Sequence, residues 1–146
     1  MNFIRELLAQ KGDGVRSVPG DCTVLDAACA MNEAHIGAVV VLEGGRMAGI
    51  LTERDVMTRV VAAGRDPART RVSQVMTSRV LTCTPQTRLS EARAVMRSKR
   101  IRHLPVVEGD VVVGIVSIGD MNLCETETLV ETIRHMEAYI AGEVAL

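Results

Sequence analysis

The chain is almost without aromatic side chains, since Phe3 and Tyr139 are the only two among its 146 residues. Proteins that bind single-stranded nucleic acid or RNA loops stack bases on aromatic side chains, and two are too few to build such a platform. The formal net charge of -1 adds no general attraction to a polyanion. We therefore expect no nucleic-acid partner, and a core filled by aliphatic residues and the eight methionines.

Cysteine pairs and long apolar runs are also missing. The four cysteines, at 22, 29, 83 and 124, form no C-x-x-C pair, and the three histidines stand apart from any cluster with the spacing of metal ligands. This pattern predicts free thiols in a reducing cytoplasm and no metal site. No run approaches the roughly 18 apolar residues that cross a bilayer, and Met1 to Gln10 lacks a signal peptide's apolar region. We expect a cytoplasmic protein without membrane contact.

The most informative feature that is present is an internal repeat. Residues 26–55 return 65 positions later as residues 91–120, with nine of the 30 aligned positions identical, among them Gly49/Gly114 and Asp55/Asp120. A unit this short cannot bury its apolar face alone and usually packs against a partner copy. The repeat predicts two copies facing each other about a pseudo-twofold axis, with two related candidate sites between them.

Each copy predicts the same order of elements: helix, strand, tight turn, strand, helix. Apolar periodicity and turn residues place these elements at 26–33, 36–42, 47–51 and 53–61 in the first copy, and at 90–98, 103–107, 111–116 and from 118 onward in the second. The predicted fold class is therefore α+β. We expect residues 1–14 to form a lead helix, 15–70 and 71–124 the two repeat domains, and 125–146 a C-terminal helix.

The predicted C-terminal helix carries an apolar seam. Leu129, Ile133, Met136 and Ile140 follow a 4-3-4 spacing, which aligns them along one helix face. Such a seam is stable when it is buried. The sequence leaves open whether the body of the same chain or a second copy covers it.

The sharpest local motif lies where each second strand meets its following helix. It spans Gly49 to Asp55 and Gly114 to Asp120, with a hydroxyl at the helix N-cap and a carboxylate three residues later. One interpretation is a capping box that only satisfies backbone N–H groups. The other is a ligand site, in which the helix start attracts a phosphate and the carboxylate accepts both hydroxyls of a ribose. Two copies, each with a glycine suited to close backbone approach, favour the second interpretation.

These two G-h-x-[ST]-x-x-D segments, the strand from Ile101 to Val107 and the lead-in Val75-Met76-Thr77 resemble a tandem pair of cystathionine-beta-synthase (CBS) domains. The resemblance covers about Val15 to Asn122, with no catalytic domain attached. It implies a pseudo-twofold pair of CBS repeats, called a Bateman module, each with a short leading strand, and usually two modules in a homodimer. It also implies clefts for an adenosine ligand, with AMP foremost and ADP, ATP, NADH or S-adenosylmethionine as alternatives.

Carried onto this chain, the family's pattern implies that Asp55 and Asp120 hold the ribose hydroxyls of two sites, with Thr52 and Ser117 near ribose or phosphate. Adenine pockets are implied to come from strand edges of the opposite copy. These residues are Ile36, Gly37 and Ala38 for the Asp120 site, and Ile101, Arg102 and His103 for the Asp55 site. The segments that enter the copies, Ser17-Val18 and Val80-Leu81, are implied to close the pockets.

The two implied sites differ in their guanidinium groups. Position 54 is Arg where its counterpart 119 is Gly, and position 102 is Arg where its counterpart 37 is Gly. A guanidinium binds phosphate through paired hydrogen bonds, which glycine cannot imitate. We hypothesise that one cleft binds the charged nucleotide more tightly, with Arg54, Arg100 and Arg102 as its phosphate partners.

Three functions are compatible with these residues. The first is a regulatory module that senses energy or redox state through an adenine nucleotide and acts on an unknown regulated protein. The second, a nucleotide-metabolising enzyme, is disfavoured because the sequence holds no nucleophile with a neighbouring base, no P-loop and no metal constellation. The third is a scaffold or dimerisation module whose clefts stay empty. The first is our prediction, with no catalytic residue.

Overall fold

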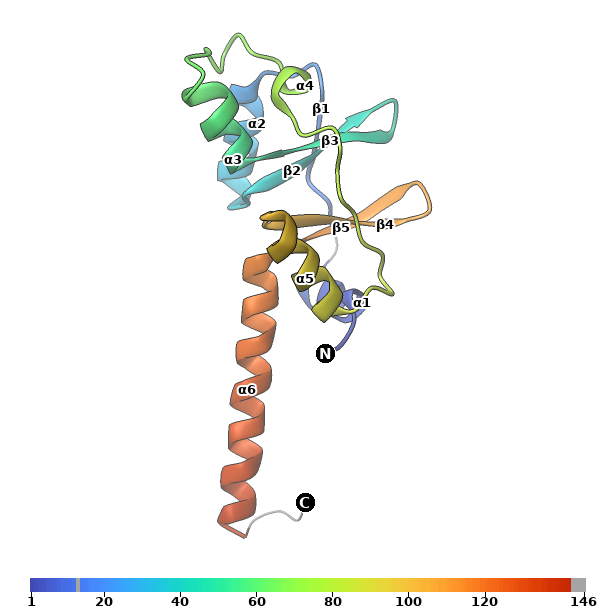
Figure 1. Cartoon of the computed structure of the whole chain (residues 1–146), viewed down its shortest axis with the longest axis vertical. Helices are drawn as coiled ribbons and strands as arrows, with labels where there is room; N and C mark the ends of the chain where they lie inside the picture. The colour runs from blue at the N-terminus through green and yellow to red at the C-terminus, as the bar shows by residue number, and fades with distance from the viewer. Residues whose placement is uncertain (13, 143–146) are drawn as a thin grey trace.

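The computed structural model describes residues 1–12 and 14–142, and it contains two like units stacked on one another (Figure 1). The first unit holds β1 (Ser17–Pro19), α2 (Val24–Ala34), β2 (Ala38–Glu43), β3 (Arg46–Thr52), α3 (Glu53–Asp55), the π-helix η1 (Val56–Val61) and α4 (Val72–Val75). The second unit holds α5 (Leu89–Lys99), β4 (His103–Glu108), β5 (Val111–Ser117) and α6 (Ile118–Ile140), together with α1 (Ile4–Lys11). The predicted α+β class and the predicted pair of repeats are confirmed.

The two sheets share the same strand pairing, including one irregularity in register. β2 pairs antiparallel with β3 and β4 with β5, and both hairpins shift register at the same point, after Val41 and after Val106. β1 runs parallel to β2 and pairs Val18 with Val41. In the second unit this leading strand is reduced to a single parallel bridge between Cys83 and Val106. The first sheet therefore has three strands and the second has two.

The helix after β3 departs from the predicted α-periodicity. It is α-helical over Glu53–Asp55 and π-wound over Val56–Val61. Val60 is fully buried, whereas Val61, the next residue of the predicted helix, is 70% exposed. The wider π-turn changes the angle between successive side chains, so the 3.6-residue pattern does not hold along this segment.

The helix that precedes each unit in the sequence packs on the other unit. Ile4 and Leu7 of α1 lie in the core of the second unit, and Val72 and Val75 of α4 lie in the core of the first. The supporting backbone hydrogen bonds match: Ile4 donates to the Thr87 carbonyl as Val72 donates to that of Cys22, both at 2.9 Å. The segment before each unit therefore packs on the other unit, which ties the two repeats together.

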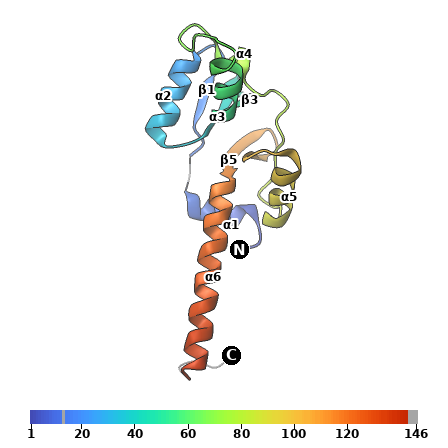
Figure 2. The same ribbon diagram turned by 60° about the vertical axis from the view of Figure 1, so that its left-hand side comes forward.

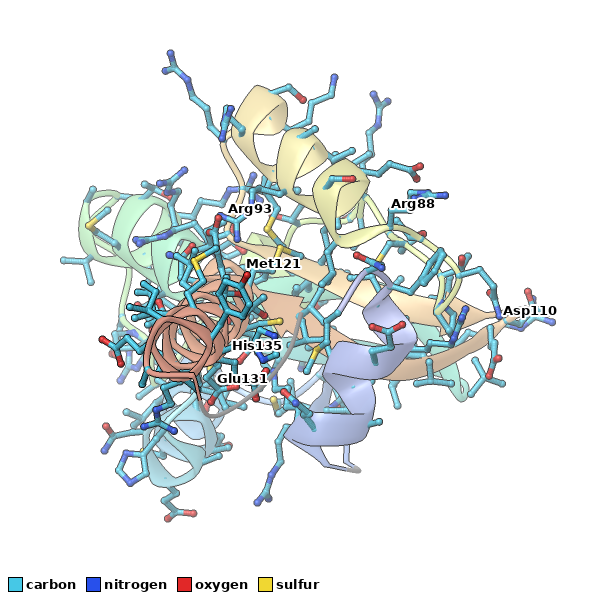
Figure 3. The ribbon with its side chains drawn as sticks, turned by 90° about the horizontal axis from the view of Figure 1, so that it is seen from below. Arg88, Arg93, Asp110, Met121, Glu131 and His135 are labelled. Carbon is cyan, nitrogen blue, oxygen red and sulfur yellow. The ribbon has the colours of Figure 1, made fainter. Side chains whose placement is uncertain are left out.

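One uninterrupted helix, α6, leaves the second unit and projects from the body (Figure 2). Arg93 of α5 holds its first turns, with Nη1 3.1 Å from Asn122 Oδ1 and Nη2 3.3 Å from Glu125 Oε2. Arg93 lies beside α6 in the view along that helix (Figure 3). The predicted boundary between residues 124 and 125 falls inside this helix.

The apolar seam of α6 faces solvent in this chain. Leu129, Ile133, Met136 and Ile140 are between 54% and 82% exposed. Within residues 1–12 and 14–142, the body therefore does not cover the seam. Over the same residues, no helix is long and apolar enough to cross a membrane.

Candidate functional site

A cleft of about 610 Å³ opens between the two units beside Asp55. Its first wall is the start of the helix that follows β3, and its second wall is the segment that enters the second unit together with the beginning of β4. The predicted residues that line it are Thr52, Arg54, Asp55, Val80, Leu81, Arg100, Ile101, Arg102 and His103, joined by Gly37 and Ser117. The pseudo-twofold arrangement thus brings residues of both copies into one cleft, and their part in binding a ligand stays a prediction.

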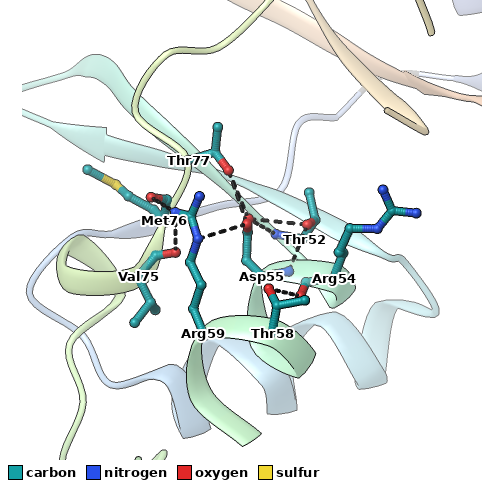
Figure 4. A network of polar contacts seen from close by, with 8 residues as sticks. All are labelled: Thr52, Arg54, Asp55, Thr58, Arg59, Val75, Met76 and Thr77. Carbon is teal, nitrogen blue, oxygen red and sulfur yellow. Dashed lines mark hydrogen bonds and ion pairs between the residues drawn. The ribbon is translucent and has the colours of Figure 1, made fainter. Parts of the chain in front are cut away.

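Asp55 is held in a network of hydroxyl and N–H donors (Figure 4). Its Oδ2 accepts hydrogen bonds from the Thr52 backbone N–H at 3.0 Å and from the Thr52 hydroxyl at 3.1 Å. The Thr77 hydroxyl lies 3.0 Å from Oδ1, and Arg59 Nε lies 3.9 Å from the same oxygen. Asp55 therefore forms a complete capping box and is 6% exposed at the floor of the cleft. The capping and ligand interpretations are thus compatible, because the capping carboxylate also lines a cavity.

The second wall of this cleft includes the end of α5, which Arg54 contacts from the first wall. α5 ends at Arg100, which takes the left-handed conformation with φ 53°, as His35 does with φ 54° at the end of α2. This ending lets the Ile101 N–H donate to the Met96 carbonyl at 3.0 Å, and it turns the chain into β4. Arg54 donates to the Arg100 carbonyl at 2.9 Å, which links the two units across the cleft.

The second cleft, beside Asp120, is about half as large, at about 300 Å³. Ser117 and Asp120 repeat the capping box, and the predicted residues Ile36, Gly37 and Ala38 form the opposite wall. Here the carboxylate is already occupied: Lys11 Nζ lies 2.8 Å from Asp120 Oδ2 and 2.7 Å from the Ile115 carbonyl. Burial would raise the pKa of Asp120, but hydrogen bonds from Lys11 and Ser117 outweigh it and hold this pKa below its ordinary value.

Gly37 and His103 lie where the two clefts meet, and both residues line both of them. A Cβ at Gly37 would come within 2.5 Å of Glu53 Oε1 and 3.3 Å of His103 Cε1. A side chain here would have to displace the end of the Glu53 side chain, and it would also press on His103 of the other unit. Burial lowers the pKa of His103, and the opposing field of the nearby Glu53 carboxylate does not restore it.

The glycines of the repeated motif lie against the segments that precede the two units. A Cβ on Gly49 would lie 2.6 Å from the Thr77 carbonyl oxygen, and one on Gly114 would lie 2.6 Å from Leu8 Cδ2. Gly49 lines neither cleft, so it does not meet our expectation of close approach to a ligand, whereas Gly114 lines the second cleft and that expectation stays a prediction there. Both glycines admit the ends of α4 and α1, which occupy equivalent places in the two units.

Ser17 and Val18 also differ from expectation, since neither lines either cleft. They lie in β1, where Val18 is 9% exposed in the core of the first unit and the flanking residues point outward. The alternation of a strand commits Val18 to the core. Val15 and Arg16, immediately before β1, line the second cleft instead.

Lys11 and Thr77 are the site residues that sequence reasoning missed. Lys11 is the last residue of α1 and Thr77 follows α4, and each contacts the motif carboxylate of the unit on which its helix packs. A signal did exist, because Ile4, Leu7 and Leu8 of the lead align with Val72, Val75 and Met76 of the linker, 68 positions later. That alignment extends the repeat to the segments before each unit.

The clefts supply hydrogen-bond acceptors and cations, but few groups for bond-breaking chemistry. Across residues 1–12 and 14–142, no three His, Cys, Asp or Glu side chains gather where they could hold a metal ion. The four cysteines are free in this structure. Burial raises the pKa of Cys83 to about 11, so this thiol is a poor nucleophile at neutral pH.

Comparison with known proteins agrees with this architecture. A family model for the CBS domain matches residues 11–62 and again residues 72–122. The mitochondrial CBS domain-containing protein CBSX3 of Arabidopsis thaliana is 37% identical over 127 residues, which are 84% of this chain and 62% of that protein. The CBS domain-containing protein YhcV of Bacillus subtilis is 38% identical over 107 residues, 73% of this chain and 76% of that protein. The chain thus spans less than two thirds of the Arabidopsis relative.

Solved structures with the same fold include a CBS-domain crystal structure, NE2398, with a TM-score of 0.82 and 31% identity over 85% of this chain and 97% of that one. The CBS domain protein PAE2072 from Pyrobaculum aerophilum, complexed with AMP, has a TM-score of 0.72 and 26% identity, covering 81% and 88% of the two chains. A hexameric CBS-CP12 protein from bloom-forming cyanobacteria has a TM-score of 0.73 and 28% identity, covering 83% and 69%.

Proposed function

This chain belongs to the CBS-domain family, and we propose that it is a regulatory module that binds an adenosine nucleotide, with AMP foremost, in the cleft beside Asp55. The single observation that carries the proposal is a cleft of about 610 Å³ with a buried carboxylate at its floor and guanidinium groups on its rim. Ligand sites commonly fall between about 300 and 1,000 Å³. The AMP complex of the Pyrobaculum protein supports the choice of ligand.

The floor of this cleft suits a ribose. Asp55 faces the cleft with hydroxyl groups beside it, and a hydroxyl can donate or accept as it rotates. Thr77 can therefore turn its donor from Asp55 toward a ligand oxygen while a ribose hydroxyl takes its place on the carboxylate. Ile50, Met57 and Leu81 offer apolar surface to the base.

The rim suits phosphate. Arg54, Arg100 and Arg102 come from both units and line the same opening. A phosphate that binds them favours the spacing of the two units at which all three reach it. Because a ligand shifts a conformational equilibrium only by its difference in affinity for the two states, this spacing is how binding is communicated to other surfaces.

We propose no catalytic role for the chain. The hydrogen bonds of Asp55 come from Thr52 and Thr77, which hold it as an acceptor and not as half of a nucleophile and base pair. The alternative of an empty scaffold is countered by the cleft itself, whose lining is polar at its floor and charged at its rim. A nucleotide sensor of this kind would act in the cytoplasm on a regulated protein that remains to be found.

Thermal or urea unfolding with added nucleotide tests the proposal. AMP at a hundred times its dissociation constant should raise the free energy of unfolding by about 2.7 kcal/mol. ATP, ADP, NADH and S-adenosylmethionine, compared at equal concentration, rank the alternatives. Asp55→Ala should abolish the shift, whereas Asp110→Ala, at the exposed turn of the other unit, should retain it. If no adenosine compound at millimolar concentration raises the stability, the proposed function is wrong.

We also propose a homodimer in which α6 pairs with the α6 of a second copy. The 4-3-4 spacing of Leu129, Ile133, Met136 and Ile140 is the pattern of a seam that packs against another helix, and these side chains are exposed here. The hexameric cyanobacterial neighbour shows that this fold supports assembly. Sedimentation should give a dimer that Ile133→Glu weakens and Glu131→Lys, away from the seam, leaves intact.

A further inference from the structure

The two clefts are related by the repeat, but the segment that closes each floor differs in charge. In the first unit the end of α4 delivers Thr77 to Asp55, and in the second the end of α1 delivers Lys11 to Asp120. Both residues also contact equivalent strand positions: the Thr77 backbone N–H donates to the Ile50 carbonyl, and the Lys11 ammonium donates to the carbonyl of Ile115, the counterpart of Ile50. A neutral hydroxyl and an ammonium group thus contact the equivalent carboxylates.

This difference decides what each carboxylate can accept. The Thr77 hydroxyl can exchange its donor for an acceptor by rotation, so a ribose hydroxyl can join it on Asp55. The Lys11 ammonium has donors only, and it satisfies Asp120 Oδ2 at 2.8 Å and the Ile115 carbonyl at 2.7 Å at once. The Ser117 N–H also donates to Asp120 Oδ2, at 2.8 Å. A ribose must therefore break a charge-assisted bond before it reaches that oxygen.

The volume of the second cleft also disfavours a nucleotide at that site. Leu8, on the same helix as Lys11, fills the space over Gly114, and the cleft measures about 300 Å³ against about 610 Å³ for the first. A volume of 300 Å³ is at the lower limit of ligand sites. The second cleft also lacks a counterpart of Arg54, because Gly119 stands at that position.

We propose that Lys11 is the residue that closes the second cleft to nucleotide, so that each chain binds one nucleotide, at Asp55. This inference rests on the proposed function and adds its stoichiometry. The lysine acts as a tethered substitute for the ligand: it neutralises Asp120 and fixes α1 against the second unit. The resulting asymmetry belongs to the folded single chain and does not require a second copy.

Calorimetric titration of the full chain with AMP tests the inference. Wild-type protein should bind one equivalent, and Lys11→Met, which keeps most of the side-chain length without the charge, should bind two. Lys99→Met is the matched control, since Lys99 is the only other lysine and lines neither cleft; it should bind one. Asp55→Asn in the Lys11→Met background should return the stoichiometry to one, now at the second cleft.

The possible failures are distinguishable. Two equivalents in the wild-type chain, or one in a folded Lys11→Met chain, would refute the inference and leave the proposed function standing. No binding by the wild-type chain would refute both. Should Lys11→Met not fold, nuclear magnetic resonance of protein labelled at its two lysine side chains gives the answer. The Lys11 signal should keep its position when AMP saturates the chain, and movement toward the position seen in Asp120→Asn would overturn the inference.

Discussion

The Asp55 and Asp120 clefts are built on the same sequence motif, but their carboxylates differ in exposure and in the groups that contact them. Both carboxylates close a capping box on a Thr or Ser, and both lie at the meeting of two units. The Asp55 side chain is 9% exposed and accepts hydrogen bonds from neutral hydroxyls, with Arg59 Nε 3.9 Å away, whereas the Asp120 side chain is 25% exposed and paired with Lys11 at 2.8 Å. A duplicated motif therefore does not make two equal sites, because the segments that pack over the two motifs place different side chains on the carboxylates.

The comparison also separates structural from ligand-directed residues. Backbone features that match between the units, such as the paired bulges and the left-handed helix ends, maintain the fold. Residues that differ, such as Arg54 against Gly119 and Thr77 against Lys11, give each cleft its own chemistry. Variants at matched positions can therefore test the asymmetry directly.

The largest expected difference is in the stability that is lost when each of the two carboxylates is removed. Asp55→Ala should lower the free energy of unfolding by about 3 kcal/mol, because it removes a buried acceptor and leaves the Thr52 N–H without its partner. Asp120→Ala should lower it by about 1 kcal/mol, because this site is more open to water. Urea unfolding without ligand measures both, with Asp110→Ala as control. Equal losses would mean that the two capping boxes contribute alike.

The second largest expected difference is in the stability lost when the motif glycines are replaced by alanine. Alanine at Gly49 would press on the Thr77 carbonyl, which is backbone, and should cost about 2 kcal/mol. Alanine at Gly114 would press on the far end of Leu8, which can turn aside, and should cost less than about 1 kcal/mol. Unfolding midpoints of the two variants check this. A larger loss at Gly114 would indicate that α1 is the more rigid of the two helices.

The left-handed helix ends offer a matched pair of smaller effect. Glycine adopts positive φ without the Cβ clash, so His35→Gly and Arg100→Gly should each stabilise the fold by about 1 kcal/mol. Arg100→Gly also removes a guanidinium from the rim of the first cleft and should weaken AMP binding about fivefold. His35→Gly should leave AMP affinity unchanged. Equal affinities in both variants would remove Arg100 from the phosphate partners.

The smallest expected effect is a pH dependence from His103, which both clefts share. Its pKa is lowered in the folded state, so the neutral form is the one that folding favours. Stability from this group is fully present above the unfolded value of about 6.5 and declines as the pH falls from there through the lowered pKa. His103→Gln should flatten the stability profile over that range. His135→Gln, on the exposed part of α6, should not.

Much of the fold could be predicted because it is local or repeated. The helices and strands of both copies lie within a few residues of their predicted positions, since apolar alternation and turn glycines report on neighbours in sequence. The family resemblance, and not the spacing of the repeat, implied that Asp55 would face Ile101 to His103 across the units, and these residues line one cleft. The same resemblance implied that Val18 would close a pocket, but the alternation of β1 buries it in the core of the first unit, which a family pattern carried over residue by residue does not report.

The sequence by itself determined the duplication, the order of elements and the pair of capping carboxylates, because each is encoded in the spacing of nearby residues. Only the tertiary structure decided which helix packs on which unit, and therefore that Lys11 reaches Asp120 across 109 positions of chain. The physical reason is that a short amphipathic helix carries its apolar face in its sequence but not the identity of the core that buries it. Which core buries each of these helices decides that Lys11 contacts Asp120 in one cleft and that Thr77 contacts Asp55 in the other.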